Sequence, residues 1–248
     1  MIAVRLTLIT FLALLQLLQH TILPTCVSGW IWTWIVKTAM YIFNSRITIH
    51  GDKRLLEKSG LLIMANHYSG IDFPVIASMF DTSKIYTVVK SDLINDPANK
   101  HILATLLASL NSAFMRALHF IPYKRGNRED GALVKNAIVD KLNEGHNVLI
   151  FPEGTTHRDG VPKEFKQGIF HLVCDNKLPI LPITLKYTKD IGAEPGDPLV
   201  FATYFDTEVA IYLHDVMEAE SDAQTLRERV FKTICDPVTQ KVEPVGQT

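Results

Sequence analysis

The chain has 248 residues, with 25 Lys and Arg against 26 Asp and Glu, and its formal net charge at pH 7 is −1. This balance leaves no broad basic surface, which excludes nucleic acid as an expected partner. The length suits one α/β domain with a sizeable core together with a membrane element, because apolar residues concentrate in the segment before residue 46.

Two apolar stretches, residues 6–23 and 27–43, open the chain. Polar side chains inside both stretches weaken them as complete bilayer spans, so we expect a helical hairpin that enters one leaflet, with basic residues holding both of its ends on the cytoplasmic side. A cleaved signal peptide is the open alternative. The predicted domains are a membrane-associated hairpin over residues 1–46 and a second domain over residues 47–248, which we expect on the cytoplasmic face of a membrane.

Beyond the hairpin, short apolar runs typical of strands alternate with longer stretches of helical periodicity. Strands are predicted at residues 47–51, 61–65, 85–89, 147–151, 180–185, 199–204 and 209–213, and helices at residues 98–118, 127–142 and 222–234. This alternation predicts an α/β fold, in which a mixed, largely parallel sheet is flanked by helices. Functional sites in such sheets lie beyond the strand ends.

A polar heptapeptide, Asn66 to Asp72, follows the strand predicted at residues 61–65, and it places His67 five residues before Asp72. Residues five apart in one helix lie about 140° from each other around the axis, so their side chains do not meet. They can meet if His67 lies in a turn and Asp72 lies in the first turn of a helix that Pro74 helps to start. His67 would then be a general base that Asp72 orients. The open alternative is a helix cap beside an ordinary loop histidine.

A second polar turn follows the strand predicted at residues 147–151, and its sequence is Pro152-Glu153-Gly154-Thr155-Thr156-His157-Arg158-Asp159-Gly160. Glycine and the neighbouring amides can approach an anion closely, and Arg158, Lys163 and Lys166 supply positive charge nearby. An ordinary turn is the open alternative, because Pro-Glu-Gly is a common turn composition.

The three cysteines, Cys26, Cys174 and Cys235, are far apart and lack the spacing of metal ligands. Their odd number and wide separation indicate neither a disulfide framework nor a metal site, and favour a reducing compartment.

Taken together and in this order, the two polar motifs resemble those of the glycerolipid acyltransferases, the lysophosphatidate acyltransferase family. Members of that family carry an Asn-His-x-Ser block that is followed closely by Asp, and a Phe-Pro-Glu-Gly-Thr block. Three weaker blocks of this chain also fit: Phe120–Arg125, Phe165–Gly168 and Leu181–Ile183. Two positions depart from the family pattern. His119 stands where the family usually has glycine, and Thr156 replaces an arginine that often follows Glu-Gly-Thr.

The resemblance implies a membrane-bound O-acyltransferase that moves a fatty acyl group from acyl-CoA to the free hydroxyl of lysophosphatidic acid, which forms phosphatidic acid. His67 and Asp72 would be its catalytic pair, acyl-CoA would be a co-substrate, and no cofactor is expected. The resemblance also implies a set of acceptor-binding residues: Lys124, Arg125, Glu153, Gly154, Thr155 and Arg158. Each of two residues in this set has an open alternative role. Arg125 could be a solvated surface charge, and Glu153 could cap a helix or form a salt bridge.

Three other functions stay open beside this one. The first is a lysophospholipid acyltransferase with a headgroup-bearing acceptor, which Thr156 supports. The second is a membrane-bound hydrolase that uses the same His-Asp pair, and the third is a scaffold without activity. Membrane lipids, a lysophospholipid acceptor and an acyl thioester donor are the expected partners.

Overall fold

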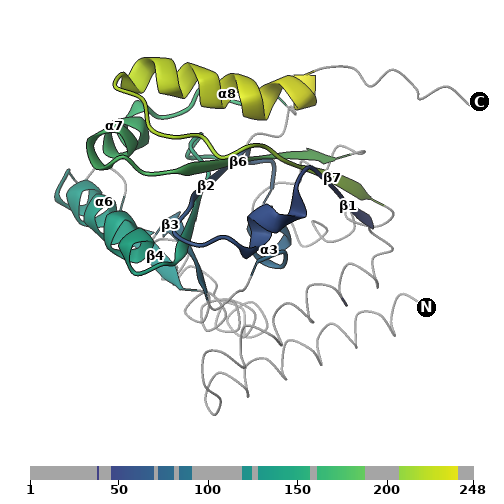
Figure 1. Ribbon diagram of the computed structural model, residues 1–248, viewed down its shortest axis with the longest axis horizontal. Helices are drawn as coiled ribbons and strands as arrows, with labels where there is room; N and C mark the ends of the chain where they lie inside the picture. The colour runs from purple at the N-terminus through teal and green to yellow at the C-terminus, as the bar shows by residue number, and fades with distance from the viewer. Residues whose placement is uncertain are drawn as a thin grey trace, which may run out of the picture. The chain divides into compact units, whose positions relative to one another are not determined.

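The computed structural model describes residue 38 and residues 46–69, 72–80, 84–90, 119–124, 128–156, 161–187 and 207–239 (Figure 1). The hairpin predicted for residues 1–46 lies outside these ranges except at residues 38 and 46, and the predicted helix at 98–118 and strand at 199–204 lie wholly outside them. None of the helices within the described ranges is long and apolar enough to cross a membrane.

The described chain forms two compact units that are interleaved along the sequence. The first unit contains residues 54–62 and 73–150, and the second contains residues 46–53, 63–72 and the chain from Phe151 onward.

The first unit is built on three parallel strands in the order β5 (Asn147–Ile150), β3 (Ile85–Lys90) and β4 (Phe120–Tyr123). All four residues of β5 are buried, which is typical of a strand inside a parallel sheet. Helix α6 (Arg128–Asn143) packs against β4 and β5.

A Schellman motif ends α6 at Gly145, within three residues of the predicted end at residue 142. The amide of Gly145, with φ of 82°, donates to the carbonyl of Leu142, and the amide of His146 donates to that of Lys141. The last helical carbonyls are thereby paired, and glycine takes the left-handed conformation without a steric cost.

The second unit is built on strands in the order β1 (Arg46–His50), β7 (Glu208–Leu213), β6 (Ile180–Tyr187) and β2 (Leu62–Ala65). Strand β7 pairs parallel with β1 and antiparallel with β6. Helix α8 (Ala223–Thr239) packs against β6 and against α7 (Gln167–Asn176), and Figure 1 shows both helices on the same side of β6.

The turn after β1 requires glycine. Gly51 has φ of 101°, and a Cβ atom at this position would lie 2.2 Å from the carbonyl oxygen of Leu213. Any side chain at this position would therefore push β1 and β7 apart or force a strained backbone.

The predicted α/β class and the mixed, largely parallel sheet are confirmed, and each predicted strand within the described ranges lies within two residues of an observed one. The sequence did not predict α7 or the 3₁₀ helix η1 (Lys53–Glu57). Helix α7 begins at Lys166 without a side-chain cap and contains Gly168, so its local signals are weak. Its stability comes instead from burial of an apolar face: Phe170, Leu172 and Val173.

Helix α8 is also longer than predicted, because it continues past Ile234 and through Pro237. Proline removes one amide donor from a helix, and carbonyls of the last turn lack helical partners. Side chains of β6 donate to carbonyls near this end of the helix: Thr184 Oγ1 lies 2.7 Å from the carbonyl oxygen of Ile234, and Lys186 Nζ lies 2.8 Å from that of Pro237, which belongs to the last turn. These long-range bonds are absent from any local pattern.

Candidate active site

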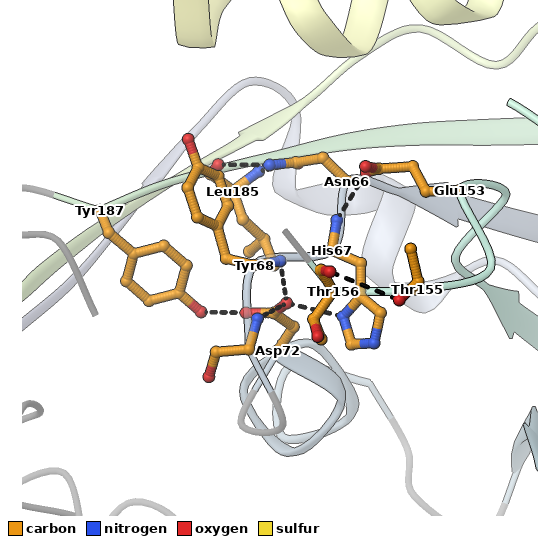
Figure 2. Close-up of polar contacts among 10 residues, drawn as sticks. Asn66, His67, Tyr68, Asp72, Glu153, Thr155, Thr156, Leu185 and Tyr187 are labelled. Carbon is orange, nitrogen blue, oxygen red and sulfur yellow. Dashed lines mark hydrogen bonds and ion pairs between the residues drawn. The ribbon is translucent and has the colours of Figure 1, made fainter. Parts of the chain in front are cut away.

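His67 and Asp72 meet where a strand gives way to a helix. Strand β2 ends at Ala65, and α3 (Asp72–Ala77) begins at Asp72, so the two residues stand on either side of the predicted boundary. His67 Nδ1 lies 2.9 Å from Asp72 Oδ2 (Figure 2). The geometry that the five-residue spacing requires is therefore present, and the catalytic role of the pair stays a prediction.

The contacts of Asp72 determine which nitrogen of His67 carries the proton. Asp72 Oδ2 also lies 2.6 Å from the amide nitrogen of Tyr68 and 2.7 Å from that of Ser69, and both amides can only donate. An oxygen that accepts from two amides also accepts from His67, so Nδ1 carries hydrogen and Nε2 carries the lone pair. Within the part of the chain that the structure describes, no hydrogen bond occupies Nε2.

The carboxylate of Asp72 is fully buried and is held at both of its oxygens. While Oδ2 accepts from His67 and the two amides, Oδ1 accepts from the hydroxyl of Tyr187 at 2.5 Å. Figure 2 shows His67, Tyr68 and Tyr187 around the carboxylate, and Tyr187 reaches it from the end of β6. Donors on both oxygens fix the plane of the Asp72 carboxylate. The carboxylate in turn fixes the orientation of the His67 ring, which donates to it.

The imidazole ring is fixed by packing as well as by Asp72. It stacks on Phe151, with 4.0 Å between ring centroids and 14° between ring planes. The side chain of His67 still has 20% of its surface exposed, whereas that of Asp72 has none. The Nδ1 edge of the His67 ring is thus held by the protein, and another part of the ring is exposed. A general base needs such exposure to reach the proton that it removes.

Asn66 links the loop that carries His67 to β6 through two hydrogen bonds. Its Nδ2 donates to the carbonyl of Leu185 at 2.8 Å, and its Oδ1 accepts from the amide of the same residue at 2.7 Å. The side chain is fully buried, so neither group can bond to water instead. The amide side chain therefore pairs with Leu185 as a neighbouring strand would.

Glu153 accepts hydrogen bonds from the same loop and from the segment that begins at residue 161. One carboxylate oxygen accepts from the amide of His67 at 2.8 Å, and the other accepts from the amide of Lys163 at 2.8 Å. The Glu153 residue is only 1% exposed. Its acceptor-binding role stays a prediction from the resemblance, and its observed contacts join two segments of backbone.

The turn that follows Glu153 has the conformation that its glycine suggests. Gly154 has φ of 69°, and its amide donates to the carbonyl of Phe151 at 3.0 Å. Thr155 is exposed, and its hydroxyl lies 3.4 Å from the carbonyl oxygen of Thr156. Thr155 and Gly154 therefore lie on a turn that Glu153 connects directly to the backbone of His67.

The other predicted acceptor-binding residues lie in the first unit or outside the described residues. Lys124 lies in the first unit, is exposed, and donates its amide to the carboxylate of Asp130 at 2.8 Å. Arg125 and Arg158 lie outside the described residues. Among the residues that are described, no group of three or more His, Cys, Asp and Glu side chains could hold a metal ion.

The sequence did not predict several contacts of the site, among them the Tyr187 hydroxyl, the Phe151 ring, the Lys163 amide and the backbone of Leu185. Phe151 and Tyr187 each stand at or directly after the end of an apolar strand, β5 and β6 respectively. That position is the one signal that could have found them, because sites in α/β sheets gather at strand ends.

The nearby thiol of Cys235 is not prepared for nucleophilic chemistry. Burial, with a smaller contribution from the negative charge of Glu153, raises the pKa of Cys235 to about 12. Only the thiolate form of cysteine is a strong nucleophile, so Cys235 is inert at neutral pH.

Comparison with known proteins identifies the family. A family model described as Acyltransferase matches residues 46–186, which is more than half of the chain and includes both polar motifs. The chain belongs to the acyltransferase family.

Curated relatives of this acyltransferase cover it to different extents. A 1-acyl-sn-glycerol-3-phosphate acyltransferase from Borreliella burgdorferi is 22% identical over 85% of the chain and 77% of its own length. A putative 1-acyl-sn-glycerol-3-phosphate acyltransferase from Caenorhabditis elegans is 26% identical over 79% of the chain and 65% of its own length. The human beta form is 25% identical over 60% of the chain, and the match spans only 50% of that protein.

A crystal structure supports the fold of this acyltransferase. The 1-acyl-sn-glycerophosphate (LPA) acyltransferase PlsC from Thermotoga maritima superimposes with a TM-score of 0.63 and 18% sequence identity, over 98% of this chain and all of the other. At this low identity the likeness concerns the fold.

Proposed function

We propose that the protein transfers a fatty acyl group from acyl-CoA to the free hydroxyl of lysophosphatidic acid, forming phosphatidic acid. The observation that carries this proposal is the His67–Asp72 pair, whose Nδ1–Oδ2 distance of 2.9 Å leaves the Nε2 lone pair of a partly exposed ring for chemistry. The names of the curated relatives support the choice of acceptor, since those proteins are 1-acyl-sn-glycerol-3-phosphate acyltransferases.

The chemical step needs a base and no protein nucleophile. His67 Nε2 removes the proton from the acceptor hydroxyl, and the hydroxyl oxygen forms a bond to the thioester carbonyl carbon. The tetrahedral intermediate then breaks its carbon–sulfur bond, and coenzyme A leaves with the electron pair as a thiolate, which takes up the proton from His67. Asp72 stabilises the imidazolium that exists between these two proton transfers.

The position of Thr156 bears on the acceptor. An arginine that often stands there in the family is absent, so an acceptor with a larger headgroup is the second candidate. A panel of lysophospholipids, each assayed with acyl-CoA and read by mass spectrometry, compares the two acceptors directly. Omitting the acceptor measures thioester hydrolysis, which would dominate if the protein were a hydrolase.

His67→Ala tests the mechanism. Loss of a general base lowers turnover by about 10²- to 10⁴-fold, and the fold should persist because the ring is partly exposed. His171→Ala is the matched control, since His171 is an exposed histidine on α7. Near-normal turnover in folded His67→Ala would overturn the proposed function.

We also propose that residues 1–46 anchor the enzyme to one face of a membrane. Two apolar stretches with basic flanks support this, and an acceptor with a long acyl chain lies in the bilayer. Deleting residues 1–45 should release the protein from membranes or cause aggregation, with activity falling most on long-chain acceptors. Recovery of a soluble mature protein beginning near Cys26 would instead establish a cleaved signal peptide.

A further inference from the structure

The two oxygens of the Asp72 carboxylate receive donors from different parts of the chain. Oδ2 is bonded by His67 and by the amides of Tyr68 and Ser69, all within five residues of Asp72. Oδ1 is bonded by the hydroxyl of Tyr187, which is 115 residues away along the chain. Figure 2 shows Tyr187 approaching the carboxylate from the side opposite the imidazole.

The local donors restrain only one of the two oxygens of Asp72. Rotation about the bond between the β-carbon and the carboxyl carbon is soft, because such sp³–sp² torsions have broad minima. Oδ1 and Oδ2 turn together about this bond, and the three local donors restrain the rotation at Oδ2. The bond from Tyr187 restrains the same rotation at Oδ1, on the other side of the axis.

The phenol ring of Tyr187 is itself held from two sides. Its backbone is part of β6, where Tyr187 pairs with Val209 of β7. Its ring meets the ring of Tyr68 edge to face, with 5.5 Å between the centroids and 65° between the planes. The hydroxyl group is thus presented to Asp72 by a paired strand, and the ring lies against the residue that follows His67.

We propose that Tyr187 is a positioning residue for acyl transfer: its hydroxyl fixes the Asp72 carboxylate, and through it the orientation and tautomer of His67. This inference rests on the proposed function, in which His67 is the base. Tyr187 itself touches neither substrate in this scheme, so it should affect the chemical step and leave substrate binding unchanged.

Tyr187→Phe removes the hydroxyl and keeps the ring that contacts Tyr68. We expect kcat to fall roughly tenfold, with the KM values for acceptor and acyl-CoA unchanged, because a bond to a charged group is worth about tenfold or more. Tyr212→Phe is the matched control. Tyr212 lies on β7, where its ring stacks on His50, and this variant should keep wild-type kcat.

A spectroscopic measurement separates positioning from a general loss of stability. In ¹⁵N-histidine-labelled enzyme, the ring signal that disappears in His67→Ala belongs to His67, and in wild type it should report hydrogen on Nδ1. Tyr187→Phe should shift this signal toward a mixture of the two tautomers, while Tyr212→Phe should leave it unchanged.

The results for His67→Ala and Tyr187→Phe test the proposed function and the positioning role of Tyr187 separately. Full activity in His67→Ala would overturn the proposed function. If His67→Ala is inactive and Tyr187→Phe keeps wild-type kcat and the wild-type His67 signal, the positioning role alone is overturned. A lower melting temperature of Tyr187→Phe with unchanged kcat would also overturn it, since Tyr187 would then only stabilise the fold.

Discussion

Glu153→Gln distinguishes a residue that joins two backbone segments from one that binds the acceptor. In the structure, each carboxylate oxygen of Glu153 accepts one amide, from His67 and from Lys163. Glutamine has nearly the same shape, but the nitrogen of its side-chain amide, Nε2, can donate a hydrogen bond and cannot accept one. One of the two amides would therefore face a donor, and the other would lose its charged partner.

The size of the effect follows from burial. Glu153 is 1% exposed, so water cannot replace the lost partner. A buried group left unpaired costs about 1–3 kcal/mol, and loss of the charge weakens the second bond, so we expect a destabilisation of about 3 kcal/mol in total. For a chain of this size that lowers the melting temperature by roughly 6–12 °C. Because the amide of His67 is one of the two, kcat should also fall, by about 10²-fold if the ring moves by about 1 Å.

The assay combines thermal unfolding with steady-state kinetics in which each substrate is varied at saturation of the other. Glu164→Gln is the matched control, because it makes the same charge change at an exposed position nearby, where substitutions usually stay within about 0.5 kcal/mol. If Glu153→Gln kept the melting temperature and kcat and raised only the KM for the acceptor, Glu153 would be an acceptor contact and the reasoning above would be wrong.

The remaining predictions concern other parts of the chain. Asn66→Ala leaves both backbone groups of Leu185 buried and without a partner, and should lower the free energy of unfolding in urea by about 2–5 kcal/mol. An unchanged urea midpoint would show that the bonds from Asn66 do not stabilise the fold. Burial lowers the pKa of His214 below 6.5, so the folded protein binds this proton less readily than the unfolded chain does. Stability should accordingly be full above pH 6.5 and decline as the pH falls below it, and His214→Gln should make that decline shallower in unfolding measured across pH. Arg125→Ala should raise the KM for a phosphate-terminated acceptor at least roughly tenfold with little change for acyl-CoA, and equal effects on both substrates would remove it from the acceptor site. Lys135→Ala, an exposed charge on α6, is the control for this kinetic comparison.

Local patterns predicted the elements whose signal is contained within a few residues. The fully buried strands β2 and β5 are short apolar runs that end in polar turns, and Gly145 ends α6 through its own conformation. The His67–Asp72 pair was also predictable, because both residues lie in one loop and the five-residue spacing permits contact only across an element boundary.

Long-range contacts could not be predicted in the same way. The pairing of Tyr187 with Asp72 spans 115 residues, and the pairing of Asn66 with Leu185 spans 119. The residues around one partner do not indicate the other partner, because the contact depends on which strand lies beside β2 in the sheet. The two amides on Glu153 are also invisible in sequence, since every residue except proline has the same backbone donor.

The bond pair between Asn66 and Leu185 sets an order of events during synthesis. The loop that carries His67 leaves the ribosome 119 residues before the backbone that its neighbour Asn66 must bind. Closing such a long loop costs entropy that is recovered only when the distant strand is present. A nascent chain that ends before β6 therefore holds both catalytic residues of the proposed pair without Leu185 to fasten the loop or Tyr187 to hold Asp72. Under the proposed function, acyl transfer should begin only after residue 187 has left the ribosome.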